Sequence, residues 1–196
     1  MTEDQSGPAS PGPDLARLYE LEDRRSREQW NRSLPVVEAA TDRWQRATSL
    51  GFGAGTSIYH LSYVYGDVSV GENTWIGPYT LLDGSGGLRI GSYCSISAGV
   101  HIYSHNTVKW AVSAGNSPYE RQPTEIGDCC FLGPHSVVAM GVKVADHCVV
   151  GAHSFVNRDV PEYSIVAGTP ARIIGKIDTS ADGELTFRYD GPDAGP

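Results

Sequence analysis

The sequence lacks the features expected of a nucleic-acid-binding or membrane-spanning protein. It holds 15 Lys and Arg against 23 Asp and Glu, a net charge of −8, and no basic cluster. Nothing in it can neutralise a phosphate backbone, so we expect no nucleic-acid partner. No apolar run approaches the roughly 18 residues that a membrane-spanning helix needs. The first fourteen residues are acidic and lack the apolar centre of a secretory signal. We therefore expect a cytoplasmic protein without membrane contact.

Cysteine is also scarce, and its spacing excludes the common metal motifs. Four cysteines stand at positions 94, 129, 130 and 148, and none forms a CxxC pair. We expect no metal site and a reducing compartment. The acids gather at the two ends, where residues 1–14 and 178–196 carry seven of the eight net negative charges. The first segment is rich in Pro, Gly and Ser, which predicts a disordered tail, and the second is an acidic extension.

Residues 15–53 are predicted to be helical. Two partial apolar stripes with helical spacing run through Leu15–Leu21 and Val36–Ala47. Pro35 suits the first turn of a second helix, and Gly51 suits its exit. These helices are expected to cap one end of the structure that follows.

The next hundred residues repeat an aliphatic side chain every six positions, with two extra residues in the stretch 84–87. The aliphatic positions are Val64, Val70, Ile76, Leu82, Ile90, Ile96, Ile102, Ile126, Leu132, Val138, Val144, Val150 and Val156. Gly often follows, and a small or β-branched residue usually stands four positions later. A period of six fits neither an α-helix nor a hairpin, and it predicts a solenoid of stacked short strands around a continuous core. Three of the cysteines then occupy the small inward slot, and only Cys129 faces outward.

The repeat is interrupted after Ile102. The interval to Ile126 equals four repeats, yet its register positions include Glu120, which does not suit a core. Pro118 and Pro123 are poor material for a buried strand. Residues 103–125 are therefore predicted to be a loop that leaves the solenoid, and a loop this long is usually either functional or disordered. Trp110 gives the loop something to pack with.

The repeat units resemble a known family. IGPYTL, IGSYCS, IGDCCF and VGAHSF, with the stretch NRDVPEYSIVAGTPARIIGKI at 157–177, are similar to hexapeptide-repeat acyltransferases, particularly sugar and xenobiotic acetyltransferases. The resemblance implies a left-handed parallel β-helix over residues 54–177 and a homotrimer with its sites between subunits. It also implies acetyl-CoA as co-substrate, no required metal, and a sugar, nucleotide sugar or glycosylated product as acceptor.

Acyl transfer from a thioester needs a base that accepts the proton of the acceptor, and histidine suits this role near neutral pH. In the family a histidine at the base of the loop is this base, and the matching residue is His105. The family usually has proline after it, whereas this chain has Asn106. The resemblance loosely places Asp83 beside the acceptor. His101 and Trp110 are further candidates for contacting it.

The resemblance also assigns the cofactor side. Ala152 and, one coil earlier, Pro134 match positions along the pantetheine arm, although proline offers no N–H. The remaining candidates match the nucleotide end of the cofactor: Asn157, Gly168, Thr169, Pro170, Arg172 and Lys176.

Two alternatives stay open. One is a γ-type carbonic anhydrase, which shares the β-helix and binds zinc with three histidines across a subunit interface. His101, His105 and His135 are available for this, although their spacing is a poor match. The other alternative is a scaffold that kept the fold and lost the chemistry.

Overall fold

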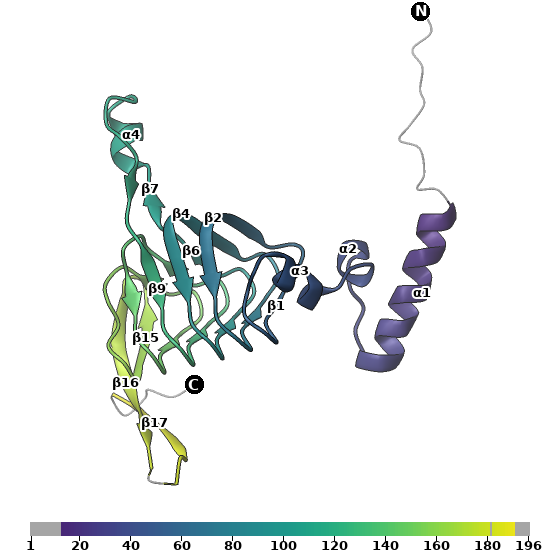
Figure 1. Ribbon diagram of the computed structural model, residues 1–196. Coiled ribbons are helices and arrows are strands. Elements are labelled where there is room, and N and C mark those ends of the chain that lie inside the picture. The colour runs from purple at the N-terminus through teal and green to yellow at the C-terminus, as the bar shows by residue number, and fades with distance from the viewer. Residues whose placement is uncertain (1–12, 181, 191–196) are drawn as a thin grey trace, which may run out of the picture. The chain divides into compact units, whose positions relative to one another are not determined.

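The computed structural model describes residues 13–180 and 182–190 (Figure 1), so most of the predicted N-terminal tail and the end of the acidic extension lie outside the described residues. The chain forms two compact units, Met1–Asp42 and Arg43–Pro196. None of the helices in the described ranges has the length and apolarity to cross a membrane.

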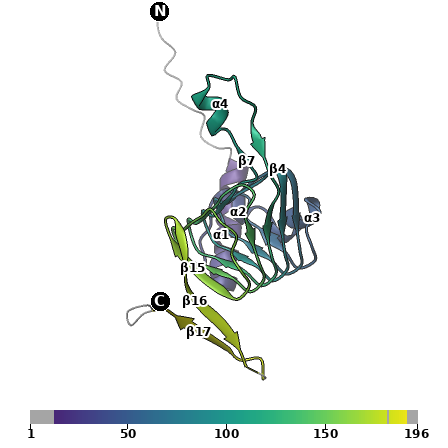
Figure 2. The ribbon, with the colours of Figure 1, turned by 90° about the vertical axis from the view of Figure 1, so that its left-hand side faces the viewer.

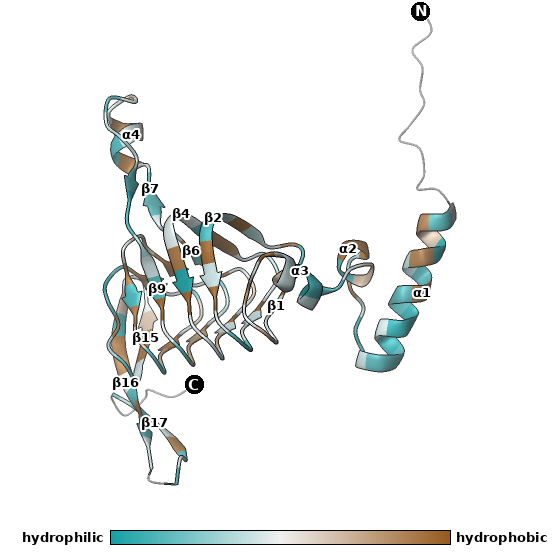
Figure 3. Cartoon of the chain, in the orientation of Figure 1, coloured by the Kyte–Doolittle hydropathy of each residue, from teal (hydrophilic) through white to brown (hydrophobic). Residues whose placement is uncertain are grey.

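The first unit holds α1 (Pro13–Trp30) and α2 (Val36–Ala39). Helix α1 is mostly hydrophilic (Figure 3), and the hydroxyl of Tyr19 donates to the carbonyl of Leu34 at 3.2 Å. The expectation of one continuous helix after Pro35 is wrong, because the chain breaks between α2 and α3 (Arg43–Ser49). At the break the Thr41 hydroxyl donates to the carbonyl of Val37, a local bond that competes with helix propagation.

The second unit is a parallel β-helix, as the repeat predicts. Most of its strands are two residues long, because each crosses one wall of a triangular coil before the chain turns. The strands are β1 (Ser57–Ile58), β2 (Tyr63–Val70), β3 (Trp75–Ile76), β4 (Leu81–Ile90), β5 (Ser95–Ile96), β6 (His101–Ile102), β7 (His105–Asn106), β8 (Glu120–Arg121), β9 (Thr124–Ile126), β10 (Phe131–Leu132), β11 (Val137–Val138), β12 (Lys143–Val144), β13 (Val149–Val150), β14 (Phe155–Val156), β15 (Ser164–Gly168), β16 (Ala171–Thr179) and β17 (Leu185–Tyr189).

The strands stack into three walls. Wall one is β1-β3-β5-β10-β13-β15, which continues through the antiparallel β16 and β17. Wall two contains the first halves of β2 and β4, then β6, β11 and β14. Wall three contains the second halves of β2 and β4, then β9 and β12. Walls two and three form one sheet because β2 and β4 run through the corner between them.

The core is the column of aliphatic residues that the repeat identifies. Twelve of the thirteen positions are buried, and Val64 is half-buried against the same core. Ile58 extends the column to the first coil. Helix α3 packs on β1 at that end, and Ala47 joins the core. Arg43 donates to the hydroxyl of Tyr59 at 2.8 Å, which further ties α3 to the first coil.

One inner corner explains the cysteines. Cys94, Cys130 and Cys148 are buried and Cys129 is exposed, as predicted. Each buried thiol donates to a carbonyl of the next coil, at 3.1 Å for Cys94, 3.1 Å for Cys130 and 3.0 Å for Cys148. Thr74, one coil earlier, makes the equivalent bond to Gly91 at 2.9 Å. This corner therefore favours a small side chain that can donate a hydrogen bond to the next coil, so small size alone is not sufficient.

Candidate active site

The two irregularities of the repeat lie next to each other. The two extra residues lengthen β4 through 84–87, and the loop leaves wall two after β6 (Figures 1 and 2). The N–H of Gly86 donates to the Ser104 hydroxyl at 2.8 Å, and the N–H of Gln122 donates to the Ser104 carbonyl at 3.0 Å. A Cβ on Gly86 would lie 2.3 Å from the Ser104 oxygen. The bulge is therefore hydrogen-bonded to the start of the loop and packs closely against Gln122 near its end, and only glycine permits so close an approach.

This contact brings together two of the residues singled out from the sequence. His105 Nδ1 lies 2.5 Å from Oδ2 of Asp83, although the two residues are 22 positions apart. An ionised carboxylate can only accept, so this bond places the proton of a neutral imidazole on Nδ1 and leaves the Nε2 lone pair unprotonated. The His105 side chain is 33% exposed, whereas Asp83 is fully buried. The pair has the geometry of a histidine base with a buried carboxylate that orients it.

Asp83 does not fit the acceptor contact expected for it. Its Oδ1 accepts the Ser85 hydroxyl at 2.5 Å and the Ser85 N–H at 3.0 Å, and its Oδ2 accepts the Ser104 N–H at 2.9 Å beside His105. Burial raises the pKa of Asp83, but these hydrogen bonds outweigh it and hold the pKa at about 2. Asp83 is thus a buried, charged carboxylate bonded to His105, and both of its oxygens are already occupied by hydrogen bonds, so neither is available to the acceptor substrate.

The predicted loop is an ordered arm made of β7, α4 (Val108–Val112) and β8. Strands β7 and β8 pair antiparallel, and farther out Trp110 packs edge-on against Tyr119 at 5.4 Å between ring centroids. Lys109 binds Glu120 at 2.6 Å. Trp110 therefore holds the arm together, and nothing in its contacts favours a role in acceptor binding.

Asn106 has a structural reason to replace the proline of the family pattern. Its side-chain oxygen accepts the N–H of Val108 at 2.8 Å, which closes a local turn at the start of α4. Proline has no side-chain acceptor and could not make this hydrogen bond, so the turn is fixed here by the asparagine side chain.

His101 lies on wall two beside residues that the sequence did not single out. The ring of Tyr103 stands edge-on between His101 and His105, with centroid distances of 6.1 and 6.3 Å. Arg121 is directly opposite His105 in the arm, so the two side chains leave the hairpin on the same side. Neither residue could be found from the repeat, because Tyr103 and Arg121 lie in the segment where the register stops.

The cofactor candidates are all exposed, and most of them group at the corner that leads into wall two. Pro134 and Ala152 occupy equivalent positions of successive coils, and the N–H of His153 donates to the Pro134 carbonyl at 2.9 Å. Thr169 extends the row by donating to the His153 carbonyl at 3.1 Å. Gly168, Pro170, Arg172 and Lys176 lie on or beside β15 and β16, and Asn157 follows β14. His105 and this corner therefore lie at opposite edges of wall two.

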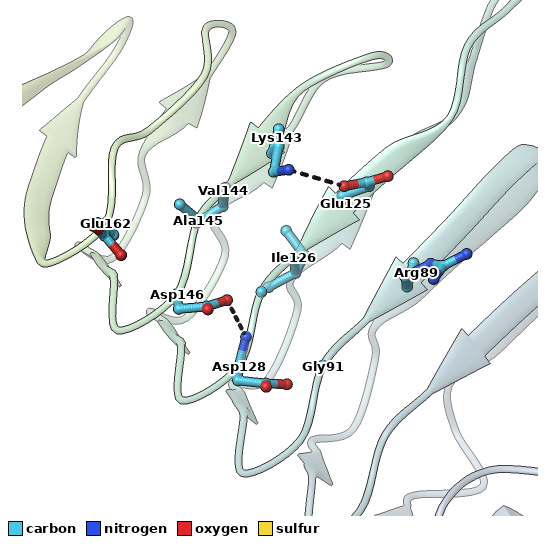
Figure 4. A pocket seen from close by; sticks show the side chains of 11 residues that line it. Arg89, Gly91, Glu125, Ile126, Asp128, Lys143, Val144, Ala145, Asp146 and Glu162 are labelled. Atoms are coloured by element: carbon cyan, nitrogen blue, oxygen red, sulfur yellow. Dashed lines mark hydrogen bonds and ion pairs between the residues drawn. The ribbon is translucent and has the colours of Figure 1, made fainter.

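A hollow of about 340 Å³ lies on wall three and is lined by charged residues of both signs (Figure 4). Lys143 reaches Glu125 across it at 3.5 Å, and the Asp146 carboxylate accepts the N–H of Asp128 at 2.9 Å. Neither His105 nor Asp83 is among its lining residues, so the hollow is not part of the site around the His105–Asp83 pair.

Within residues 13–180 and 182–190, no three His, Cys, Asp or Glu side chains gather as a metal site would require. His135 stacks on His153 at 5.2 Å between centroids, and His105 is bonded to Asp83. The zinc alternative therefore depends on a second chain, and metal analysis of the purified protein tests it.

Comparison with known proteins accounts for the repeat. Residues 123–158 match the family model described as "Bacterial transferase hexapeptide (six repeats)". The repeat in this part of the chain is therefore the hexapeptide repeat that the model describes.

Among curated relatives, the hexapeptide-repeat chain is 33% identical over 130 residues to serine acetyltransferase 4 of Arabidopsis thaliana, covering 66% of this chain and 35% of that protein. It is 27% identical over 130 residues to galactoside O-acetyltransferase of Escherichia coli (strain K12), covering 56% and 64%. The chain thus spans less than two thirds of the length of either relative.

Solved structures support the fold. A maltose O-acetyltransferase from Clostridium difficile 630 superposes with a TM-score of 0.57 at 22% identity, covering 85% of this chain and 89% of that one. A single-site mutant of AntD, an N-acyltransferase from Bacillus cereus in complex with dTDP and coenzyme A, superposes with a TM-score of 0.56 at 18% identity, covering 67% of this chain and 88% of that one. At these identities the likeness concerns the hexapeptide-repeat fold alone.

Proposed function

We propose that the chain is an acyl-CoA-dependent acyltransferase, with acetyl-CoA as donor and a hydroxyl or amino group of a sugar-containing molecule as acceptor. The observation that carries the proposal is the His105–Asp83 pair, which leaves Nε2 of a histidine whose side chain is one-third exposed as the proton acceptor at the base of an ordered arm. The acetyltransferase and acyltransferase names of the relatives and structural neighbours support the same chemistry.

In the proposed reaction the acceptor oxygen or nitrogen attacks the thioester carbonyl while its proton passes to Nε2 of His105. The carbon–oxygen or carbon–nitrogen bond forms, and the carbon–sulfur bond then breaks. His105 returns the proton to the leaving sulfur, so the products are the acylated acceptor and free CoA thiol. Asp83 holds the imidazole in the tautomer that this requires and stabilises its charged form. No covalent enzyme intermediate is needed.

The defining experiment measures release of CoA thiol from acetyl-CoA with a panel of sugars, nucleotide sugars and glycosylated products. Thiol release that depends on one acceptor class, with the acylated product identified by mass spectrometry, is the expected result. A protein that binds no acyl-CoA would be the inactive scaffold instead. Stoichiometric bound zinc together with CO₂ hydration would favour the anhydrase.

We further propose that the site forms between subunits of a homotrimer. His105 and the corner that holds Pro134 and Ala152 lie at opposite edges of wall two, so the arm of one chain would meet the cofactor corner of another. Activity per chain is expected to fall as the protein is diluted through its dissociation range, in parallel with the trimer fraction measured by light scattering. A monomer that keeps full specific activity would contradict this arrangement.

The brace between the bulge and the arm gives a further prediction. Gly86→Ala places a Cβ 2.3 Å from the Ser104 oxygen and 2.9 Å from the Gln122 nitrogen, so the backbone that carries His105 must move. A displacement near 1 Å costs about 10²-fold in rate, and we expect a loss of that order in kcat. Gly51→Asn is the matched control, because a Cβ there meets nothing within 4 Å and asparagine tolerates its φ of 75°. Unchanged kinetics for Gly86→Ala would show that the brace does not position His105.

A further inference from the structure

Wall two presents an unexplained pair of aromatic side chains. Tyr63 and Tyr65 lie two positions apart on β2, so both point outward while Val64 between them packs inward on the core. The two residues are 60% and 49% exposed, and their ring centroids lie 6.0 Å apart with an interplanar angle of 34°. Neither ring stacks on another aromatic ring in the part of the chain that the structure describes. Two adjacent exposed rings of this kind offer apolar faces with polar hydroxyl tips.

The register of the coils places this pair beside the candidate base. Tyr65 is the direct neighbour of Asp83 across the β2–β4 ladder, and Tyr63 is the neighbour of Leu81. Parallel strands are about 4.8 Å apart, so Tyr65 lies one coil from the carboxylate that holds His105. A Cβ on Gly66, which follows Tyr65, would lie 2.6 Å from the carbonyl of Gly84, so the strand and the bulge approach each other backbone to backbone. Tyr65 is therefore the ladder neighbour of the residue that binds His105, which places the tyrosine pair one coil from the His105–Asp83 pair.

The charges on the wall restrict the ligand. The outward positions of wall two are Tyr63, Leu81, His101, Val137 and Phe155 in one row and Tyr65, Asp83, Tyr103, Ala139 and Asn157 in the next. Neither row contains Lys or Arg, and Asp83 is enclosed by its own hydrogen bonds. A nucleoside diphosphate needs several cations close together. The arm carries two, Arg121 and Lys109, and Lys109 is already paired with Glu120. The surface suits an uncharged ring with one apolar face and polar edges, which describes a pyranose.

We propose that Tyr63 and Tyr65 form the acceptor subsite and that they stack against an uncharged sugar ring of the acceptor. The placement of the acceptor beside His105 rests on the proposed function, but the binding itself does not depend on turnover. The proposal selects neutral glycosides over nucleotide sugars as the substrate class.

The test measures binding directly by saturation-transfer NMR and chemical-shift titration of the full-length protein with three probes: maltose, methyl β-D-galactopyranoside and dTDP. We expect the native protein to bind at least one of the two sugars. Tyr65→Ala should raise the dissociation constant for that sugar about tenfold or more, and Tyr63→Ala should raise it less. Tyr65→Phe, which keeps the ring, should stay within about twofold. Tyr93→Asn is the matched control, because Tyr93 is 64% exposed at another corner and asparagine tolerates its φ of 57°.

Several outcomes would overturn the proposal. Failure of the native protein to bind either sugar would contradict it, and so would binding by Tyr65→Ala equal to that of the native protein. A loss of dTDP binding greater than the loss of sugar binding would assign the rings to a nucleobase. A change in oligomeric state on Tyr65→Ala, seen by light scattering, would assign them to a subunit contact. If acyl transfer is observed, Tyr65→Ala should raise KM for the acceptor and leave KM for acetyl-CoA unchanged, so the subsite can fail while the proposed function stands.

Discussion

Replacing His105 with glutamine is expected to lower kcat for acyl transfer by about 10²- to 10⁴-fold, the range that general bases contribute. Glutamine can occupy much of the same space and still bond to Asp83, but its amide does not accept a proton in the reaction. The loss should appear in kcat rather than in KM for acetyl-CoA, because the role proposed for His105 is at the reacting atoms and not in binding the cofactor. Steady-state thiol release under saturating donor and acceptor measures it.

His147→Asn is the matched control for this change. His147 also stands on the surface of the β-helix, where its ring stacks on Tyr163 at 4.6 Å, and asparagine suits its φ of 56°. Its kcat should stay within about twofold of native protein. Equal losses in the two variants, or full activity in His105→Gln, would remove His105 from the mechanism.

Asp83→Asn is the second large effect, with an expected fall in kcat of about 10²- to 10⁴-fold although the side chains are nearly the same size. The carboxylate accepts from both Ser104 and His105 through Oδ2. An amide nitrogen at the position of Oδ2 would place a second donor against the Ser104 N–H. The same nitrogen would donate to Nδ1 of His105 and so favour the imidazole tautomer with its proton on Nε2. That tautomer cannot accept the acceptor's proton. Stability should also fall, by about 1–3 kcal/mol for the unsatisfied donor.

A double variant separates chemistry from stability. If the pair acts as one unit, Asp83→Asn combined with His105→Gln should be no slower than the slower single variant, whereas independent roles would multiply the losses. Denaturant unfolding of each protein gives the stability change. Additive losses in kcat would show that Asp83 does not act through His105.

The charge of Asp83 also fixes a pH dependence. Its pKa is lowered from 3.8 to about 2 in the folded protein, so the stability it contributes is fully present above about pH 4 and is lost as the pH falls toward 2. Asp83 is therefore ionised throughout the range in which a histidine base works. The acid limb of a pH–rate profile for the native protein belongs to a group other than Asp83.

The local order of the repeat was readable from the sequence because each coil solves the same packing problem. One aliphatic residue in six must point inward, and the corner slot accepts only small side chains, so the period, the buried positions and three of the four cysteines follow directly. The exit after Ile102 was equally clear, since Glu120 and two prolines cannot continue a buried strand. The helical segment was located, but its break at Ala40–Asp42 was not, because short polar bonds such as that of Thr41 leave no periodic signal.

Only the tertiary structure decided what the two irregularities do. The sequence placed Asp83 in a bulge and His105 in a loop, and it assigned the aspartate to the acceptor. Stacking places residues from successive coils about 4.8 Å apart, so residues 22 positions apart in the chain come within hydrogen-bonding distance. Whether Asp83 and His105 meet depends on the two extra residues of the bulge and on the close contact of Gly86 with Ser104, which positions the start of the loop. Likewise Tyr65 became a neighbour of Asp83 only through the ladder register, which the sequence period alone does not fix across an insertion.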